Sequence, residues 1–289
     1  QLNLSVYDAW ERISDEAISR NGNFTAYETN PQDGDGTLHF YEKKTSEKFS
    51  FPRGSNAEFS PESNFAVFKI VPFTDSVRQA KLDKKKKDQM PEDSLGIFVF
   101  GSKKHIKIPK LKSFKVPEES GYCFEYMAEP KENDSTEGKK KSKTKGLPKT
   151  ADLVIFNPVK NIEHRFDSIS EYDISRNGEN ISFIRFTNDS INQSAVYVFD
   201  TKKETAEEIF KGQGIAKKIA SANYEKHTAF LFTEDTVKTK HYALYLSEKG
   251  DKADKKADTT STALSSGYAP SINGKLRFSR NDEKLYFGA

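Results

Sequence analysis

The chain has 289 residues, and its 46 Lys and Arg nearly balance its 43 Asp and Glu, which leaves a net charge of +3. A dedicated nucleic-acid binder needs a surface of one charge sign, so this balance argues against that function. Only 35% of the residues are hydrophobic, yet the chain holds 22 Phe and 12 Tyr. Disordered chains are poor in aromatic residues, so the composition indicates a folded core with long polar loops.

The single cysteine, Cys123, excludes an internal disulfide framework and a metal site built from several cysteines. No apolar run approaches the roughly 18 residues that a membrane-spanning helix needs. The sequence does not begin with Met. Either a signal peptide has been removed or the natural chain begins earlier.

A pattern of serine, turn and strand recurs along the chain. An apolar residue and a serine come first, a short turn follows, and alternating aromatic or aliphatic residues complete it. Asn-Gly in the turn accepts the positive φ of a tight hairpin, and the alternation suits a half-buried strand. Clear copies occupy residues 18–27, 59–68, 174–183 and 278–287, with weaker copies at 120–124 and 223–230.

Each copy is followed by two further strands around a polar turn, as in 38–41 before Lys43 and 196–199 before Asp200. Four-stranded units of about 40–60 residues are typical of a β-propeller. We therefore predict an all-β fold, an incomplete propeller of about five to six blades, with residues 1–289 as one partial domain. The alternative is a large β-sandwich of unrelated hairpins. Within 204–220, which has some helical character, the repeat assigns 205–210 to a strand.

If the strands of a unit are called A to D, the serine turn joins A to B. The long polar stretches then lie between B and C, at 71–94, 130–150, 187–194 and 234–241. Alternate connections of an antiparallel meander lie at opposite faces, so we expect these insertions to share the face away from the serine turns. Functional loops often cluster in this way.

Two of these insertions are rich in lysine, with Lys at 81 and at 84–87 in the first and six Lys within 138–149 in the second. We interpret both as solvated loops; the alternative is a docking surface for an anionic partner. No aromatic residues alternate with these lysines, so the bases of a nucleic acid have no stacking platform.

Familiar catalytic and metal-binding motifs are missing. The sequence has no Gly-x-Ser-x-Gly and no phosphate-binding loop. No two of the five histidines lie within five residues of each other, so no helical metal pair exists. We therefore assign no catalytic residue, no cofactor or cofactor-binding residue and no metal ligand, and the substrate-binding residues are unknown. The histidines are His39, His105, His164, His227 and His241. We interpret the first three as ordinary strand residues.

Acidic residues also cluster in the sequence, and three of these clusters resemble binding sites. Residues 33–36, Asp-Gly-Asp-Gly, resemble half of a calcium loop, but Lys44 takes the twelfth position, so a polar turn is favoured. Two Glu pairs resemble a site for a peptide amino terminus. For Glu118-Glu119 we favour an ordinary turn over substrate contact, and Glu207-Glu208 lies on a predicted outer strand with one side chain facing water. Cys123 is predicted to pack on an inner strand rather than to react.

Several stretches of the chain resemble one family of secreted enzymes. The most specific stretch is 6–100. The motifs that carry the resemblance are Val6–Trp10, Ile18–Gly22, Tyr27–Gln32, Gly34–Gly36, Phe59–Pro61, Phe68–Ile70, Lys84–Asp88 and Pro91–Leu95. They are similar to the N-terminal β-propeller of prolyl oligopeptidase-family serine peptidases, in particular exported ones of Bacteroides-like bacteria. The resemblance extends more weakly over the whole chain, and TolB-like propellers share the serine turn.

The resemblance implies a catalytic α/β-hydrolase domain beyond residue 289, which would carry the Ser, Asp and His of the triad. The propeller would then restrict entry to peptides. The implied partners are that domain and peptide substrates, and the implied location is periplasmic or secreted. None of the triad can be assigned to this sequence, and the paired-glutamate motif of dipeptide-releasing members has no clear equivalent.

The last repeat stops at Ala289 after two strands. We interpret the sequence as part of a longer chain and expect the open ring to self-associate or to be partly disordered near 275–289. This chain alone would then not be an enzyme, although its parent protein would be a serine peptidase. The alternative is a stand-alone TolB-like periplasmic propeller that binds proteins.

Overall fold

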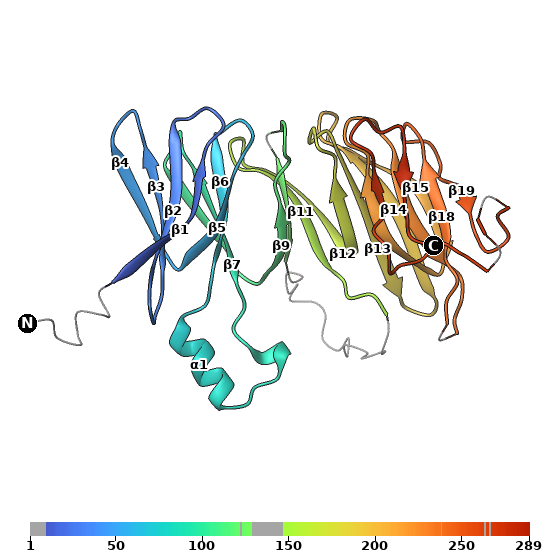
Figure 1. Ribbon diagram of the computed structural model, residues 1–289, viewed down its shortest axis with the longest axis horizontal. Helices are drawn as coiled ribbons and strands as arrows, with labels where there is room; N and C mark the ends of the chain where they lie inside the picture. Colours follow the sequence, from blue (N-terminus) through green and yellow to red (C-terminus); the bar gives the residue numbers. More distant parts are fainter. Residues whose placement is uncertain (1–9, 122, 129–146, 238, 263, 266) are drawn as a thin grey trace, which may run out of the picture. The chain divides into compact units, whose positions relative to one another are not determined.

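The computed structural model describes residues 10–121, 123–128, 147–237, 239–262, 264–265 and 267–289 (Figure 1). Within these ranges almost every regular element is a β-strand. The chain forms two compact units. Residues up to 116, with 120–128 and 155–164, belong to the first unit, and residues 117–119, 147–154 and 165–289 belong to the second.

The first unit contains two antiparallel sheets of four strands, in the orders β1-β2-β3-β4 and β5-β6-β7-β8, and the pair β9-β10. Because strand order follows chain order, each four-stranded sheet is a meander, as a propeller blade requires. The strands are β1 (Glu11–Ile18), β2 (Phe24–Pro31), β3 (Thr37–Glu42), β4 (Glu47–Pro52), β5 (Gly54–Phe59), β6 (Phe65–Ile70), β7 (Ser94–Val99), β8 (Lys104–Ile108), β9 (Leu111–Lys115) and β10 (Phe124–Ala128).

Phenylalanine side chains pack the two sheets of the first unit face to face. Phe40 on β3 is fully buried, and its ring centroid lies 5.6 Å from that of Phe51 in the same sheet. It also lies 5.9 Å from Phe68 and 6.0 Å from Phe98 in the next sheet. Such pairs contribute about 0.5–1.5 kcal/mol each beyond the burial of their area, so the aromatic residues counted in the sequence form the interface between successive sheets.

The second unit repeats this plan with the sheet β16-β17-β18-β19, the successive pairs β12-β13, β13-β14 and β14-β15, and the short hairpin β20-β21. Its strands are β13 (Asn180–Asn188), β14 (Asn192–Asp200), β15 (Thr205–Gln213), β16 (Ile215–Ser221), β17 (Thr228–Thr233), β18 (Ala243–Ser247), β19 (Asp254–Ala257), β20 (Arg277–Phe278) and β21 (Leu285–Tyr286), while β11 (Ala151–Asn157) and β12 (Ile162–Ile174) include residues of both units. A cluster that includes Val196, Val198, Phe230 and Phe232 packs its first two sheets together.

The all-β fold of propeller-type blades predicted from the sequence is confirmed, and residues 205–210 lie in strand β15 as expected. The blade total stays a prediction. Within 275–289, where the open ring predicts self-association or partial disorder, residues 277–278 and 285–286 form a hairpin. Self-association stays a prediction. Cys123 is half-buried and directly precedes β10 instead of lying on a strand.

The predicted serine turns share one geometry. At Ser19, Ser60, Ser175 and Ser279, the serine hydroxyl oxygen accepts the N–H of the residue five positions later, at 2.9, 3.2, 2.9 and 2.9 Å. The serine N–H in turn donates to the carbonyl oxygen of that same residue. The motif therefore closes its hairpin with local bonds alone.

The weaker copy at 223–230 closes its turn in another way. Ala222 replaces the serine and retains only the backbone bond to His227. The carboxylate of Asp282, from the β20–β21 turn, instead accepts the N–H groups of Asn223, Tyr224 and Glu225 at 2.8, 2.7 and 3.1 Å. An acceptor far along the chain thus replaces the local one.

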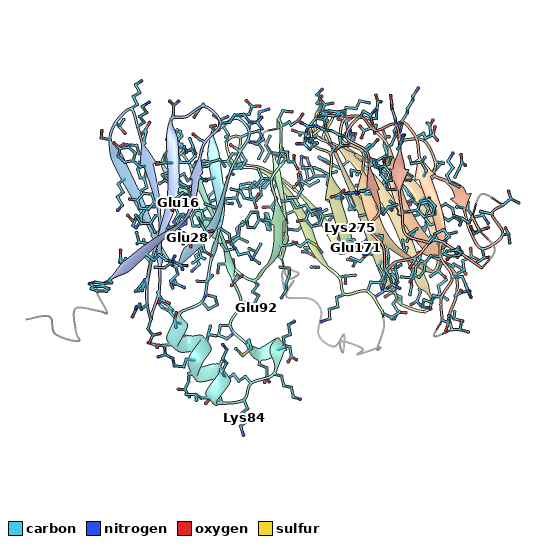
Figure 2. All side chains as sticks on the ribbon, viewed as in Figure 1. Glu16, Glu28, Lys84, Glu92, Glu171 and Lys275 are labelled. Atoms are coloured by element: carbon cyan, nitrogen blue, oxygen red, sulfur yellow. The ribbon has the colours of Figure 1, made fainter. Side chains whose placement is uncertain are left out.

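The first strand of each four-stranded sheet contains a β-bulge that was not predicted from the sequence. In β1, β5 and β16 the register shifts near Asp15, Asn56 and Lys218, which have φ of 54°, 52° and 58°. In two of these bulges, a glutamate from a strand of the sheet before it in the chain accepts the backbone N–H of the bulge residue. Glu28 binds Asn56 N at 2.7 Å, and Glu171 binds Lys218 N at 2.7 Å; Figure 2 labels both glutamates.

One helix, α1 (Thr74–Leu82), occupies the β6–β7 connection, followed by a 3-10 turn at Lys87–Gln89. It was not predicted, because its N-terminus is held by residues from the β2–β3 connection. Asp35 Oδ1 accepts Thr74 N at 2.8 Å, and Arg78 contacts both carboxylate oxygens of Asp33 at 2.8 and 3.0 Å. The two B–C connections therefore lie together in this unit, as expected from the topology.

Candidate functional site

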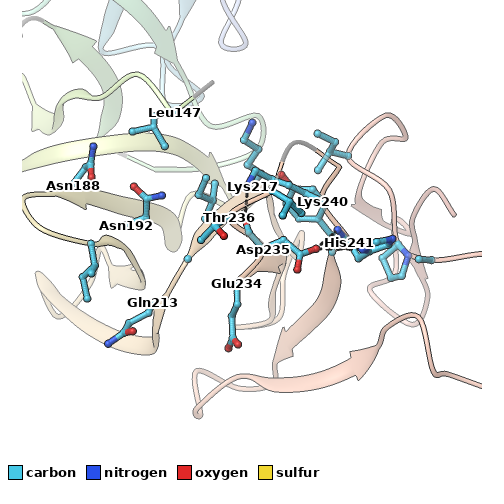
Figure 3. Close-up of a pocket in the computed structure, with 18 of the residues that line it drawn as sticks. Leu147, Asn188, Asn192, Gln213, Lys217, Glu234, Asp235, Thr236, Lys240 and His241 are labelled. Carbon is cyan, nitrogen blue, oxygen red and sulfur yellow. Dashed lines mark hydrogen bonds and ion pairs between the residues drawn. The ribbon is translucent and has the colours of Figure 1, made fainter. Parts of the chain in front are cut away.

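In the second unit, connections at the face away from the serine turns surround an open pocket of about 1470 Å³ (Figure 3). We call it the loop-face pocket. It lies where the insertions were predicted to gather. Its lining comes from the segments 188–192, 213–217, 234–242 and 269–273, together with Leu147.

Four carboxamide side chains line the loop-face pocket, and none has a hydrogen-bond partner among the described residues. They are Asn188, Asn192, Gln213 and Asn273. Figure 3 shows the first three along one side. A carboxamide offers both donors and an acceptor, so this set can pair with N–H and C=O groups of a ligand.

One positive and one negative side chain of the pocket are also unengaged. Lys217 on β16 is half-buried and Glu234 is exposed, and neither has an ion-pair partner within the described part of the chain. The pocket therefore offers one charge of each sign, and its surface favours a polar ligand of low net charge over a polyanion.

Apolar side chains stand at the tips of two connections around the pocket. Ile191, between β13 and β14, is 52% exposed, and Val237, between β17 and β18, is 61% exposed. Both belong to the lining. Exposed apolar residues beside polar groups are typical of surfaces that bind peptides or proteins.

The β17–β18 connection is held in shape by Asp235. Its Oδ2 accepts His241 N at 2.7 Å and lies 3.3 Å from His241 Nδ1, while its backbone carbonyl accepts the Lys240 ammonium. The backbone bond from His241 is the main cause that lowers the pKa of the Asp235 carboxyl. Asp235 is thus ionised at neutral pH and fixes the loop that carries Val237.

Gly214 fixes the wall between β15 and β16. Buried Ser194 donates from Oγ to Gly214 O and accepts Ala216 N, both at 2.9 Å. The glycine has a φ of 154°, and a Cβ there would lie 2.1 Å from Thr233 O. Only glycine fits this close approach of two backbones, which places Gln213 and Ile215 at the pocket.

The opposite face of the second unit holds the Glu118-Glu119 pair. Arg176 Nε contacts Glu119 Oε1 and Arg176 Nη2 contacts Glu118 Oε2, both at 2.6 Å, and Tyr224 OH donates to Glu119 Oε1 at 2.9 Å. The hydrogen bond from Arg176 is the largest cause that lowers the pKa of Glu119. These carboxylates are engaged within the fold, in agreement with the interpretation as a structural turn.

The three strand histidines lie as the sequence predicted. His39 on β3 is buried between Ser50 Oγ at 2.9 Å and Thr29 Oγ1 at 3.1 Å, and burial lowers its pKa. His105 lies on β8, where burial also lowers its pKa, and His164 lies on β12. Among the described residues, no group of three His, Cys, Asp or Glu side chains could hold a metal ion.

The remaining acidic candidates have structural roles. The 33–36 segment is a turn that anchors α1 through Asp33 and Asp35. On β15, Glu207 is exposed and pairs with Lys226, whereas Glu208 is half-buried and accepts from Tyr197 OH at 3.2 Å. The lysine-rich segment 138–149 falls mostly outside the described residues.

Sequence reasoning located two of the segments that line the loop-face pocket but none of its residues as ligand contacts. Insertions 187–194 and 234–241 were marked by length and polarity alone. The carboxamides carry no motif, and Gly214 and Ser194 become meaningful only when Thr233 of the next strand is placed beside them.

No family model and no curated protein matches the sequence. Solved structures with a similar chain path include the β-propeller domain of the Trilobed protease from Pyrococcus furiosus, at 11% identity and a TM-score of 0.46 over 96% of this chain and 78% of that one. An acylaminoacyl peptidase from Pyrococcus horikoshii is 10% identical, with a TM-score of 0.46 over 98% of this chain and 43% of that one. TolB from Acinetobacter baumannii is 9% identical, with a TM-score of 0.36 over 86% of this chain and 55% of that one.

The chain spans less than half the length of that acylaminoacyl peptidase. All three TM-scores are below 0.5, so the fold described above rests on the chain's own sheets and turns. Within the described residues, no helix is both long and apolar enough to cross a membrane.

Proposed function

We propose that this chain is a non-catalytic propeller domain of a prolyl oligopeptidase-like serine peptidase, and that it controls which peptides reach a separate catalytic α/β-hydrolase domain. The observation that carries the proposal is the loop-face pocket. Its unengaged carboxamides and its apolar tips suit an extended peptide. The resemblance over 6–100 and the blade-like sheets support the same assignment.

The gating role is steric and entropic. An extended peptide can lay its backbone along Asn188, Asn192 and Gln213 while its side chains contact Ile191 and Val237. A folded protein already pairs most of its backbone N–H and C=O groups internally, so it has few to offer to these carboxamides. Restricting entry in this way protects the reaction in the catalytic domain from bulk water and from folded proteins. A periplasmic or secreted location follows from the same resemblance.

The first test compares the purified 289-residue chain with the natural protein isolated from its source cells. We expect the natural protein to exceed 32.7 kDa, to hydrolyse short peptides and to react with a serine-directed fluorophosphonate. The isolated chain should show neither reaction. Hydrolysis by the 289-residue chain that one point substitution abolishes would overturn the proposal.

The second test changes the apolar tips in the natural enzyme. The double variant Ile191→Asp and Val237→Asp should raise KM for a decapeptide about three- to tenfold and leave kcat for a small chromogenic substrate unchanged. The double variant Ile18→Asp and Val159→Asp is the matched control, because both residues are exposed, at 71% and 51%, and belong to the first unit. Equal effects of tip and control substitutions would argue against peptide contact at the pocket.

A second candidate function is a stand-alone TolB-like module that binds proteins. Ile191 and Val237 also favour it, because exposed apolar side chains at loop tips suit protein docking as well as peptide contact. A natural protein of mass near 32.7 kDa without fluorophosphonate labelling would support this alternative.

A further inference from the structure

The β6–β7 connection of the first unit carries a dense group of positive charges. Lys81, Lys84, Lys85, Lys86 and Lys87 are all exposed, and none of their ammonium groups has a partner among the described residues. We call these five lysines the basic tip. Asp83 and Asp88 are the only acids within 81–88, so five lysines minus two aspartates leave an excess of +3.

The basic tip has a defined shape. Backbone bonds run from Asp83 N to Gln79 O, from Lys84 N to Lys81 O and from Lys85 N to Ala80 O, at 2.9, 3.0 and 3.0 Å. Asp83 accepts the side-chain amide of Gln79 at 2.8 Å. Lys84 has a φ of 52°, the left-handed conformation that ends many helices. The end of α1 therefore presents the lysines together.

The basic tip also projects from its unit. In Figure 1, α1 and the turn after it extend beyond the ends of β6 and β7, and Figure 2 shows Lys84 at the far end of this projection. Asp33 and Asp35 hold the other end of the helix against the β2–β3 connection. Several lysines can therefore reach a broad flat surface at the same time.

The side chains of the basic tip distinguish among anionic partners. All five cations are lysines, which act as flexible point charges, whereas arginine is preferred for the bidentate recognition of carboxylates. No aromatic residue lies among them to stack on bases. Leu82, between Lys81 and Lys84, is 70% exposed. A single apolar side chain among lysines suits the interface of a lipid bilayer.

We propose that the basic tip binds the surface of a membrane that carries anionic phospholipids. This proposal is independent of the peptidase assignment. Lysines near an anionic bilayer each contribute about 1 kcal/mol, which corresponds to about fivefold in binding, and the attraction falls within a Debye length. The binding is peripheral and reversible, and it would hold the first unit at the bilayer with α1 toward the lipid.

The test is co-sedimentation of the full chain with vesicles of phosphatidylcholine alone or with about one third phosphatidylglycerol. The chain should bind only the anionic vesicles, and about 0.5 M salt should release it, because charges are then screened within a few ångströms. Changing Lys84, Lys85, Lys86 and Lys87 to Gln should lower the binding at least about a hundredfold.

The matched control changes Lys43, Lys44, Lys202 and Lys203 to Gln. It removes the same charge from exposed turns elsewhere, and it leaves the lysines of 138–149 intact in both variants. This control should reduce binding less than about threefold. Equal losses in the two variants would show a nonspecific effect of net charge and overturn the proposal. Equal binding of the unchanged chain to neutral vesicles would overturn it as well.

A second measurement reports on Leu82. In a Trp10→Phe background, Leu82→Trp provides a single tryptophan, whose emission should shift to shorter wavelength on anionic vesicles. It should not shift with poly-glutamate, which offers charge without an apolar layer. A shift with poly-glutamate and none with vesicles would assign the basic tip to an acidic polypeptide instead. Circular dichroism of each variant checks that the strands are retained.

Discussion

The serine turns and the B–C connections join strands of the same sheets, but the serine turns repeat one geometry and the B–C connections differ from one another. Each serine turn closes within six residues, and the bond from the later N–H to the serine Oγ varies only between 2.9 and 3.2 Å over four copies. The B–C connections share no motif, and one contains a helix while two others line the loop-face pocket. The repeated turns thus define the scaffold, and the unrepeated connections are free to carry function.

The greatest loss of stability is predicted at Gly214, where the β15–β16 connection depends on Thr233 of another strand. Gly214→Ala should destabilise the protein by about 3 kcal/mol, because the new Cβ would lie 2.1 Å from Thr233 O and the φ of 154° is strained for alanine. Urea unfolding measures the loss. Gly101→Ala is the control, since a Cβ there has nothing within 4 Å and should change stability by less than about 0.5 kcal/mol.

The serine turns themselves should rank by burial. Ser175→Ala removes a fully buried hydroxyl that accepts Asn180 N, at an expected cost of about 1–2 kcal/mol. Ser279→Ala removes the same bond in a half-exposed turn, where water can replace it, and should cost less than about 1 kcal/mol. Chemical denaturation of both variants, with exposed Ser102→Ala as control, tests the order. A larger loss at Ser279 would show that burial does not set the strength of these turns.

A smaller effect is predicted at the β9–β10 connection, one of two A–B connections in the described residues that lack the serine turn. Glu119 has a lowered pKa in the folded protein, chiefly through the hydrogen bond from Arg176. Its stabilising contact is therefore complete above the ordinary carboxyl pKa of 4.5 and is lost as the pH falls through the lowered value. The protection factors of amides near Ser120 and Tyr224, which correct for the slower intrinsic exchange in acid, should fall as the contact is lost, and Glu119→Gln should reproduce part of this fall at neutral pH.

The matched variant for that experiment is Glu62→Gln, in the serine turn after Ser60, where the carboxylate is exposed and has no partner among the described residues. It should leave exchange unchanged at all pH values. If Glu119→Gln and Glu62→Gln change hydrogen exchange equally, the β9–β10 connection does not depend on the ion pair between Glu119 and Arg176. The contrast with the serine turns would then disappear.

The sequence predicted local structure well and tertiary contacts poorly, for a physical reason. Ser19 and Ser175 act on residues five positions away, so their motif contains its own bonding partners. Helix α1 and the Gly214 wall depend on Asp35 and Thr233, which lie elsewhere in the chain. The face of the insertions followed from strand alternation, but the carboxamides of the pocket have no pattern that marks them.

The turn after Ala222, where alanine replaces the serine, has a consequence for synthesis on the ribosome. Asn223 is separated from Asp282, the acceptor of its N–H, by 59 positions. When residues 223–225 leave the exit tunnel, water must therefore satisfy their N–H groups until the last part of this sequence emerges. We expect the 223–225 turn to become ordered last in the second unit, when Asp282 binds its N–H groups. Nascent chains that stop before residue 282 should therefore be cut by proteases at 223–225 more readily than longer ones.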